Sequence, residues 1–160
     1  MTNSILIRLG TTNDVGALAQ NHREMALETE NKTLDADTTH RGTQAVVDDP
    51  TKGFYLIAER NGVMVGQLLV TFEWSDWRSG VFWWIQSVYV LPNARRAGVY
   101  RTLHAHVLEA AKNAPNVCGV RLYVDKDNAH AQATYRAMGM HAAHYDMYEV
   151  DFVLGENRSP

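Results

Sequence analysis

Three arginines flank a glycine where an apolar run gives way to a helical pattern. Residues 87–103 read SVYVLPNARRAGVYRTL, so a strand ends near Pro92 and a helix begins at Gly98. The first amides of a helix have no acceptor within it, and the helix dipole adds partial positive charge there. With the side chains of Arg95, Arg96 and Arg101, these N–H groups can hold a diphosphate. Taken alone, the segment favours a simpler interpretation, a tight turn bordered by solvated arginines.

A second segment supports the diphosphate interpretation. Residues 128–140 read NAHAQATYRAMGM, and residues 95–100 read RRAGVY. These two runs resemble the two signatures of the GNAT acetyltransferase superfamily, N-x-x-A-x-x-x-Y-x-x-x-G-F and Q/R-x-x-G-x-G/A. The similarity covers residues 81–154 and is typical of a small, bacterial-type, single-domain member. No Rossmann fingerprint and no Walker lysine motif accompany it, which argues against a dinucleotide or a nucleoside triphosphate.

The resemblance implies acetyl-CoA as co-substrate, with its pantetheine arm between the splayed fourth and fifth strands of the sheet. The thioester carbonyl would meet a main-chain N–H near Val88 or Tyr89, which stabilises the oxyanion. Tyr135 would donate a proton to the departing thiolate, because a phenol with a pKa near 10 is protonated at neutral pH. The coenzyme contacts implied are Val88, Tyr89, Val90, Arg95, Arg96, Ala97, Gly98, Val99, Tyr100, Arg101, Asn128 and Tyr135.

Several of these residues have structural interpretations as well. Asn128 fits a helix cap and a coenzyme contact equally, and Tyr135 without its flanking motif would be a core tyrosine. Tyr100 stands where the first signature has a small residue, and Met140 replaces the residue that usually follows Gly139. We expect the Tyr100 ring to point away from the phosphates and to pack against aliphatic neighbours.

The acceptor amine must lose a proton, so a base or a water relay is needed. Glu73 is the first candidate, although a surface carboxylate at a strand end fits it at least as well. Glu28 and Glu30 are second choices, because the first two helices of this superfamily often border the acceptor site. Further acceptor-binding candidates are Trp74, Trp84 and Gln86. Indole faces attract ammonium groups, which suits an amine substrate.

Charge and composition narrow the function further. The chain has 160 residues, 46% of them hydrophobic, and a formal net charge of −3, so nucleic acid is a poor partner. The single cysteine, Cys118, cannot form an internal disulfide, and the first residues lack a secretion signal. No run approaches the roughly 20 apolar residues that span a bilayer. We therefore expect a cytoplasmic protein with no membrane partner.

The seven histidines do not suggest a metal site. His104 and His106 are two residues apart on a predicted helix, and His141 and His144 are three apart on a predicted strand. Neither spacing places both side chains on one face. We expect no metal.

Periodicity predicts an α+β domain in the order β, α, α, β, β, β, α, β, α, β, β. The predicted strands cover 4–9, 54–60, 63–74, 81–90, 118–125, 141–146 and 148–154, and the helices about 15–30, 35–47, 98–112 and 128–138. Asn61-Gly62 predicts a two-residue hairpin turn. The GNAT fold has a mixed sheet of about six or seven strands and about four helices, which this order fits. We expect one domain over 1–160, with a loose tail over 154–160.

The sequence therefore predicts an N-acetyltransferase that acts on a primary amine, preferably of a small molecule. The alternative is a non-catalytic coenzyme A-binding or regulatory module with the same fold. A homodimer formed through the last strands is implied by the superfamily only.

Overall fold

The antiparallel part of the sheet is organised around one tight hairpin. The computed structural model describes residues 4–154, and in it β2 (Phe54–Arg60) and β3 (Val63–Ser75) are joined by Asn61 and Gly62. These two residues have φ angles of 53° and 75°. Positive φ at both central positions is the geometry that favours Asn-Gly in a hairpin. The predicted turn is confirmed.

The chain divides after Tyr123 into two compact units. The first unit holds the sheet, in the order β1-β2-β3-β4-β5. Strands β1 (Leu6–Leu9) to β4 (Gly80–Val90) pair antiparallel, whereas β5 (Val117–Arg121) pairs with β4 in parallel. A parallel neighbour requires a crossover connection, and helix α3 (Val99–Asn113) provides it. The predicted mixed sheet is confirmed.

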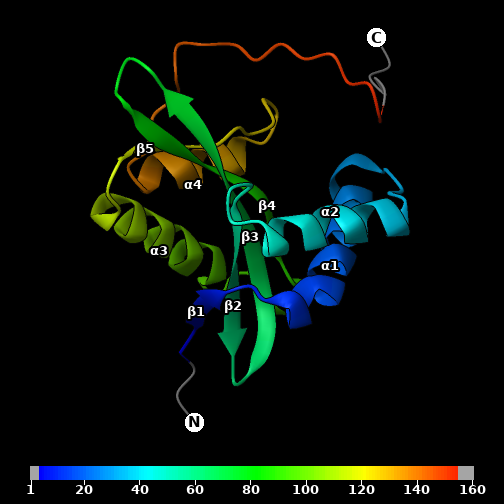
Figure 1. Cartoon of the computed structure of the whole chain (residues 1–160). Helices are drawn as coiled ribbons and strands as arrows, with labels where there is room; N and C mark the ends of the chain where they lie inside the picture. Colours follow the sequence, from blue (N-terminus) through cyan, green and yellow to red (C-terminus); the bar gives the residue numbers. More distant parts are fainter. Residues whose placement is uncertain (1–3, 155–160) are drawn as a thin grey trace. The chain divides into compact units, whose positions relative to one another are not determined.

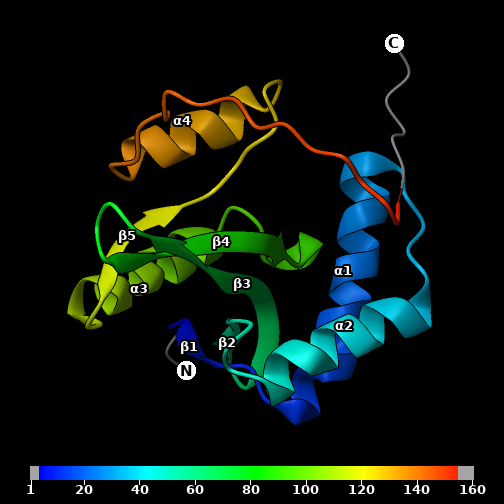
Figure 2. The same cartoon turned by 45° about the horizontal axis from the view of Figure 1, so that its top comes forward.

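Helices cover both faces of this sheet (Figures 1 and 2). On one face, Leu56 and Leu68 pack with Val99 and Leu103 of α3. On the other, Leu18 of α1 (Val15–Glu30) packs with Tyr55, Ile57 and Leu69, joined by Val46 and Val47 of α2 (Ala36–Asp48). Successive strand residues point to opposite faces, so each strand supplies both clusters. This two-sided core fixes which strand positions face α1.

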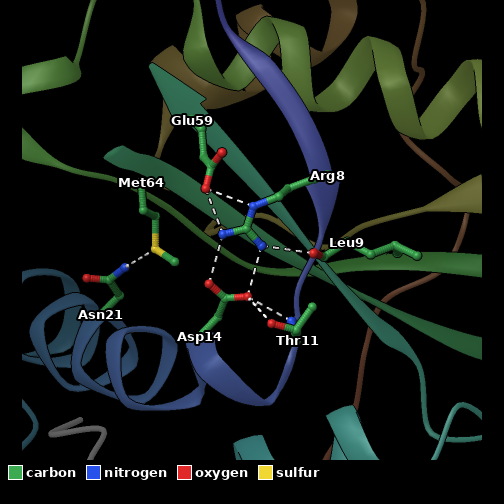
Figure 3. Close-up of polar contacts among 7 residues, drawn as sticks. All are labelled: Arg8, Leu9, Thr11, Asp14, Asn21, Glu59 and Met64. Atoms are coloured by element: carbon green, nitrogen blue, oxygen red, sulfur yellow. Dashed lines mark hydrogen bonds and ion pairs between the residues drawn. The ribbon is translucent and has the colours of Figure 1, made fainter. Parts of the chain in front are cut away.

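An ion cluster holds the start of α1 against the sheet (Figure 3). Arg8 of β1 donates two hydrogen bonds of 2.9 Å to the Asp14 carboxylate and one of 2.8 Å to Glu59 of β2. The same carboxylate accepts from the backbone N–H and the hydroxyl of Thr11, before the 3-10 turn η1 (Thr12–Asp14). The Arg8 guanidinium thereby joins β1 and the nearby start of α1 to β2, which is distant in sequence.

The second unit contains α4 (Ala129–Ala137). Its predicted start and end are confirmed: the Asn128 side chain accepts a 3.0 Å hydrogen bond from Ala131 N–H, and Gly139 follows with φ 88°. No helix in residues 4–154 is long and apolar enough to cross a bilayer. The predicted loose tail over 154–160 lies outside the described residues after Leu154.

The prediction of two strands over 141–146 and 148–154 is wrong for the described chain. Between Gly139 and Leu154 the backbone pairs with no strand, so the described sheet has five strands rather than six or seven. Tyr148 and Phe152 are 92% and 93% exposed. The Asp151 carboxylate accepts from the amides of Val153 and Leu154, which turns the chain locally. Alternating apolar residues indicate a preference for extended backbone, but a strand also needs a neighbour to pair with.

Candidate active site

Strand β4 contains a bulge near its end. Tyr89 pairs with Gln67 and Gln86 pairs with Leu69, so β4 has one more residue than β3 in this interval. Ser87, inside it, has a left-handed φ of 50°. A residue inserted into one strand bends it and breaks the alternation of side chains. Gln86 and Tyr89, an odd three positions apart, therefore lie on the same face, the one that α1 covers.

The pairing of β4 with β5 ends just before this bulge. The parallel register runs from Val81 to Trp84 on β4, and the last pair is Trp84 with Arg121, where β5 ends. Beyond Trp84, β4 continues to Val90 in contact with β3. The expected splaying of the fourth and fifth strands is confirmed. The edge of β4 that faces β5 therefore has no pairing with β5 after Trp84. The Ser87 bulge lies in this stretch of β4.

The turn from β4 into α3 follows the bulge along the chain and leads to the first backbone amides of the helix. Arg96 and Gly98 have left-handed φ angles of 62° and 77°, and Gly98 caps the helix. The first amide to bond back is that of Thr102, which donates to Gly98 O at 3.0 Å. The amides of the preceding helical residues have no acceptor within the helix. A Cβ built on Gly98 would meet no atom within 4 Å, so the turn is open there.

Tyr100, the departure from the first signature, does not block this turn. Its hydroxyl lies 3.0 Å from His104 Nδ1, and the two ring centroids are 5.6 Å apart. The ring therefore points along α3 toward the next helical turn, as expected, although it contacts a histidine rather than only aliphatic side chains. Burial lowers the pKa of His104, whose side chain is fully inaccessible. The Tyr100 ring therefore packs along α3, toward His104.

The Arg95 side chain lies elsewhere than the sequence analysis implied. Its Nη2 donates to Glu28 Oε2 at 2.8 Å, and its Nε donates to the Val90 carbonyl at 2.9 Å. Its Cζ is also 5.6 Å from the centroid of the Tyr89 ring, within cation–π range. The guanidinium thus joins α1 to the end of β4.

The Tyr89 phenol is a site residue that the sequence analysis missed, since only its backbone was implicated. It donates to Glu28 at 2.8 Å and more weakly to Glu24 at 3.3 Å. Burial, followed by the Glu28 hydrogen bond and the charges of both carboxylates, raises the pKa of Tyr89 to about 12. Hydrogen bonds from Arg95 and then Tyr89 lower the pKa of Glu28. The phenol is therefore protonated and Glu28 is ionised at neutral pH.

One signal in the sequence could have revealed this group. Glu24 and Glu28 are four residues apart on α1, which places both carboxylates on one side of the helix. Among residues 4–154, Glu24 has no ion-pair partner, whereas Glu28 pairs with Arg95 and Glu30 with Lys32. An unneutralised carboxylate therefore remains beside Tyr89.

The remaining acceptor candidates lie further from the bulge. Glu73 pairs with Phe82 on β4, and its carboxylate forms an ion pair with Arg121. Phe82 is five residues before Ser87, about 16 Å along an extended strand. Glu73 therefore lies far from the bulge and carries its own cationic partner.

The structure brings together some of the aromatic and amide candidates and separates others. Trp84 pairs with Thr71, and Gln86 donates to the Thr71 hydroxyl. The side chains of Trp84 and Gln86 therefore lie on the same face of the sheet as Glu73. Trp84 also contacts Tyr123, with ring centroids 6.0 Å apart. Trp74, next to Glu73, points to the opposite face and is 63% exposed. The expected grouping of Trp74 with Glu73 is absent.

Tyr135 and Asn128 belong to the second unit. Tyr135 lies in the last turns of α4 with a partly exposed side chain, and its carbonyl accepts from the amides of Met138 and Met140. The side chain of Asn128 caps the helix, so the structural half of its two interpretations is confirmed. No group of three or more His, Cys, Asp or Glu residues suited to a metal occurs among residues 4–154.

Comparison with solved structures shows the same fold elsewhere. A possible acetyltransferase from Clostridium difficile 630 is 39% identical, with a TM-score of 0.87, over 93% of this chain and 98% of that chain. A predicted acetyltransferase from Clostridium acetobutylicum, solved with acetyl-CoA, is 15% identical, with a TM-score of 0.74, over 94% and 97% of the two chains. AAC(6')-Iy, solved in complex with the bisubstrate analog CoA-S-monomethyl-acetylneamine, is 16% identical, with a TM-score of 0.73, over 92% and 98% of the two chains.

A search of curated proteins finds no match. The family model for the acetyltransferase (GNAT) family matches residues 17–140, which include most of α1, the β4 bulge, the Gly98 turn and α4. The chain therefore belongs to the GNAT acetyltransferase family.

Proposed function

We propose that the protein is an N-acetyltransferase that moves an acetyl group from acetyl-CoA to a primary amine of a small molecule. The amine nitrogen attacks the thioester carbonyl carbon directly, in a complex that holds both substrates. A C–N bond forms, the C–S bond breaks, the amine loses a proton and the leaving sulfur gains one. The observation that carries the proposal is the Ser87 bulge, since it lies where β4 parts from β5 and shortly before the open Gly98 turn.

Acetyl-CoA is the acetyl donor of this family, and the residues present fit it. The turn around Gly98 stands at the start of α3 and is open where a Cβ of residue 98 would lie, which suits a diphosphate at a helix start. The unpaired edge of β4 at Val88 and Val90 suits the pantetheine arm as an added strand. A main-chain N–H at Val88 or Tyr89 would stabilise the oxyanion, because a bulge redirects amides out of the ladder.

Tyr135 is our candidate general acid, and this role rests on its place in the second signature. Its phenol would give its proton to the thiolate as the C–S bond breaks. Asn128 would contact the coenzyme in addition to its observed role as a cap.

For the acceptor, the Glu24 carboxylate, which has no ion-pair partner among residues 4–154, supports an amine that is cationic when it binds, with Glu28 beside it on α1. Glu28 is a poor base, because hydrogen bonds from Arg95 and Tyr89 engage its two oxygens and lower its pKa. Glu73 fits poorly as the base, since a base must lie within about 3 Å of the proton or act through one water. We therefore propose proton loss through water, with Glu73, Trp84 and Gln86 contacting a more distant part of the acceptor.

A thiol-release assay with acetyl-CoA and a panel of small amines tests the proposal. Tyr135→Phe should lower kcat by about 10²–10⁴-fold while coenzyme A still binds, because only proton donation is removed. Coenzyme binding without turnover on any amine would instead indicate a non-catalytic module. An unchanged kcat in Tyr135→Phe would refute the role of the phenol. The homodimer, the single domain and the cytoplasmic location stay predictions.

A further inference from the structure

One side chain connects the coenzyme turn with the acceptor side of the first unit. Arg95 lies directly before the two left-handed residues of the turn, and its guanidinium donates to Glu28 on α1 and to the Val90 carbonyl on β4. Both oxygens of Glu28 are engaged, one by Arg95 and the other by the Tyr89 phenol. Three segments therefore meet at a single carboxylate.

The exposure of this pair indicates what it does. The side chains of Arg95 and Glu28 are 44% and 40% exposed, and ion pairs so accessible to water contribute little to folding stability. The fold already holds α1 through its buried contacts with Tyr55, Ile57 and Leu69. The Arg95 contacts are thus dispensable for the core, but they are placed to transmit a change in the turn to the C-terminal half of α1.

We propose that Arg95 is a positioning residue that couples coenzyme binding to the acceptor side of the site. The inference rests on the proposed function. A diphosphate bound by the amides of the turn orders the backbone that carries Arg95, and Arg95 in turn holds Glu28 and the last turns of α1. Coenzyme and acceptor then bind with mutual preference, since coupling between two sites is reciprocal.

The competing role for Arg95 is direct contact with the diphosphate. Its guanidinium would then leave Glu28 when the coenzyme binds, and Glu28 would make no difference to that step. The two roles differ in a measurable way: positioning requires both members of the pair, whereas diphosphate contact requires only Arg95.

Hydrogen exchange measured with coenzyme A as the probe distinguishes them, without any knowledge of the acceptor. In the wild-type protein, adding coenzyme A should slow amide exchange in residues 24–30 about fivefold or more, the lower range of coupling between sites. Arg95→Gln and Glu28→Gln should each abolish this slowing while coenzyme affinity, measured by calorimetry, stays near the wild-type value. The double variant should lose no more than either single variant, because both act through one contact.

Two further variants exclude a general structural effect. Arg95→Lys should retain part of the slowing, since lysine keeps the charge but lacks the fork that reaches both Glu28 and Val90. Glu109→Gln removes an exposed carboxylate on α3 and should behave as the wild type. Circular dichroism melting should show that all variants fold.

Three results would overturn the inference. Equal slowing of α1 in the wild type and in Arg95→Gln would show that Arg95 transmits nothing, and would leave the proposed acetyltransferase function intact. Loss of coenzyme affinity in Arg95→Gln but not in Glu28→Gln would make Arg95 a diphosphate ligand instead. Failure of the wild-type protein to bind coenzyme A would refute the proposed function itself, and the coupling with it.

Discussion

Replacing Gly66 with alanine should displace the coenzyme turn, because this glycine lets the first turn of α3 approach the sheet. A Cβ on Gly66 would lie 2.8 Å from Val99 Cγ1, 3.3 Å from Tyr89 O and 3.6 Å from Leu103 Cδ1. Ordinary carbon–carbon contact is about 3.5–4.0 Å, so Val99 must move by about 0.7–1.2 Å. A helical valine has essentially one side-chain rotamer, so the helix start has to move with its methyl group.

The size of the effect follows from this shift. Overpacking of this kind lowers the free energy of unfolding by about 1–3 kcal/mol, or roughly 2–12 °C in Tm. A displacement near 1 Å of groups that position a substrate costs up to about 100-fold in rate. We therefore expect Gly66→Ala to weaken coenzyme A binding and to lower kcat/KM in addition to lowering Tm.

Calorimetry with coenzyme A and thermal unfolding test both expectations. Gly42→Ala is the matched control, since a Cβ at this exposed position of α2 meets no atom within 4 Å. The control should raise stability by about 0.5–1 kcal/mol, because alanine favours helix, and should leave coenzyme affinity unchanged. If Gly66→Ala binds coenzyme A as tightly as the wild type, the close packing of α3 does not position the turn and the reasoning fails.

Substitutions at three further positions test the bulge, the turn and the ion cluster. Ser87→Val should lower stability by about 1–2 kcal/mol and reduce turnover, since a β-branched residue resists the left-handed φ, whereas Ser87→Gly should fold normally. Equal stability of the two variants in denaturant melts would contradict this. Gly98→Ala should weaken coenzyme A binding, because it adds both strain at φ 77° and a methyl group in open space. Wild-type affinity in calorimetry would exclude the turn as the diphosphate site. The hydrogen bonds from Arg8 lower the pKa of Asp14 to about 2 from 3.8, so its stabilisation of about 2 kcal/mol is present above pH 4 and is lost as the pH falls toward 2. Asp14→Asn should remove this pH dependence from urea melts, and a retained slope between pH 4 and 2 would assign it to other carboxyls.

Much of the first unit is predictable from the sequence because its signals are local. Asn61-Gly62 specifies a hairpin by φ alone, and Gly98 specifies the left-handed entry to α3 in the same way. The runs 54–60 and 63–74 on either side of this turn predict two strands, and the antiparallel pairing of β2 with β3 confirms them. These features depend on residues within one turn or one strand, so no knowledge of distant neighbours is needed.

The errors arise where a distant neighbour decides. Residues 141–154 alternate as a strand does, yet the described backbone there pairs with nothing. Glu73 lies far from the bulge because it pairs with Phe82, and this register is set by the pairing of β3 with β4. Tyr89 gained a side-chain role only because the extra residue in β4 turns its phenol toward Glu28.

The sequence by itself determined the family, the order of most elements and the turn that offers amides to a diphosphate, because these depend on short patterns of residue type. Only the tertiary structure decided that Arg95 contacts Glu28 rather than standing free beside the turn, and that the Tyr89 phenol stays protonated between two carboxylates. Contacts of this kind join residues more than 60 positions apart, and the chain brings them together only when both faces of the sheet are packed.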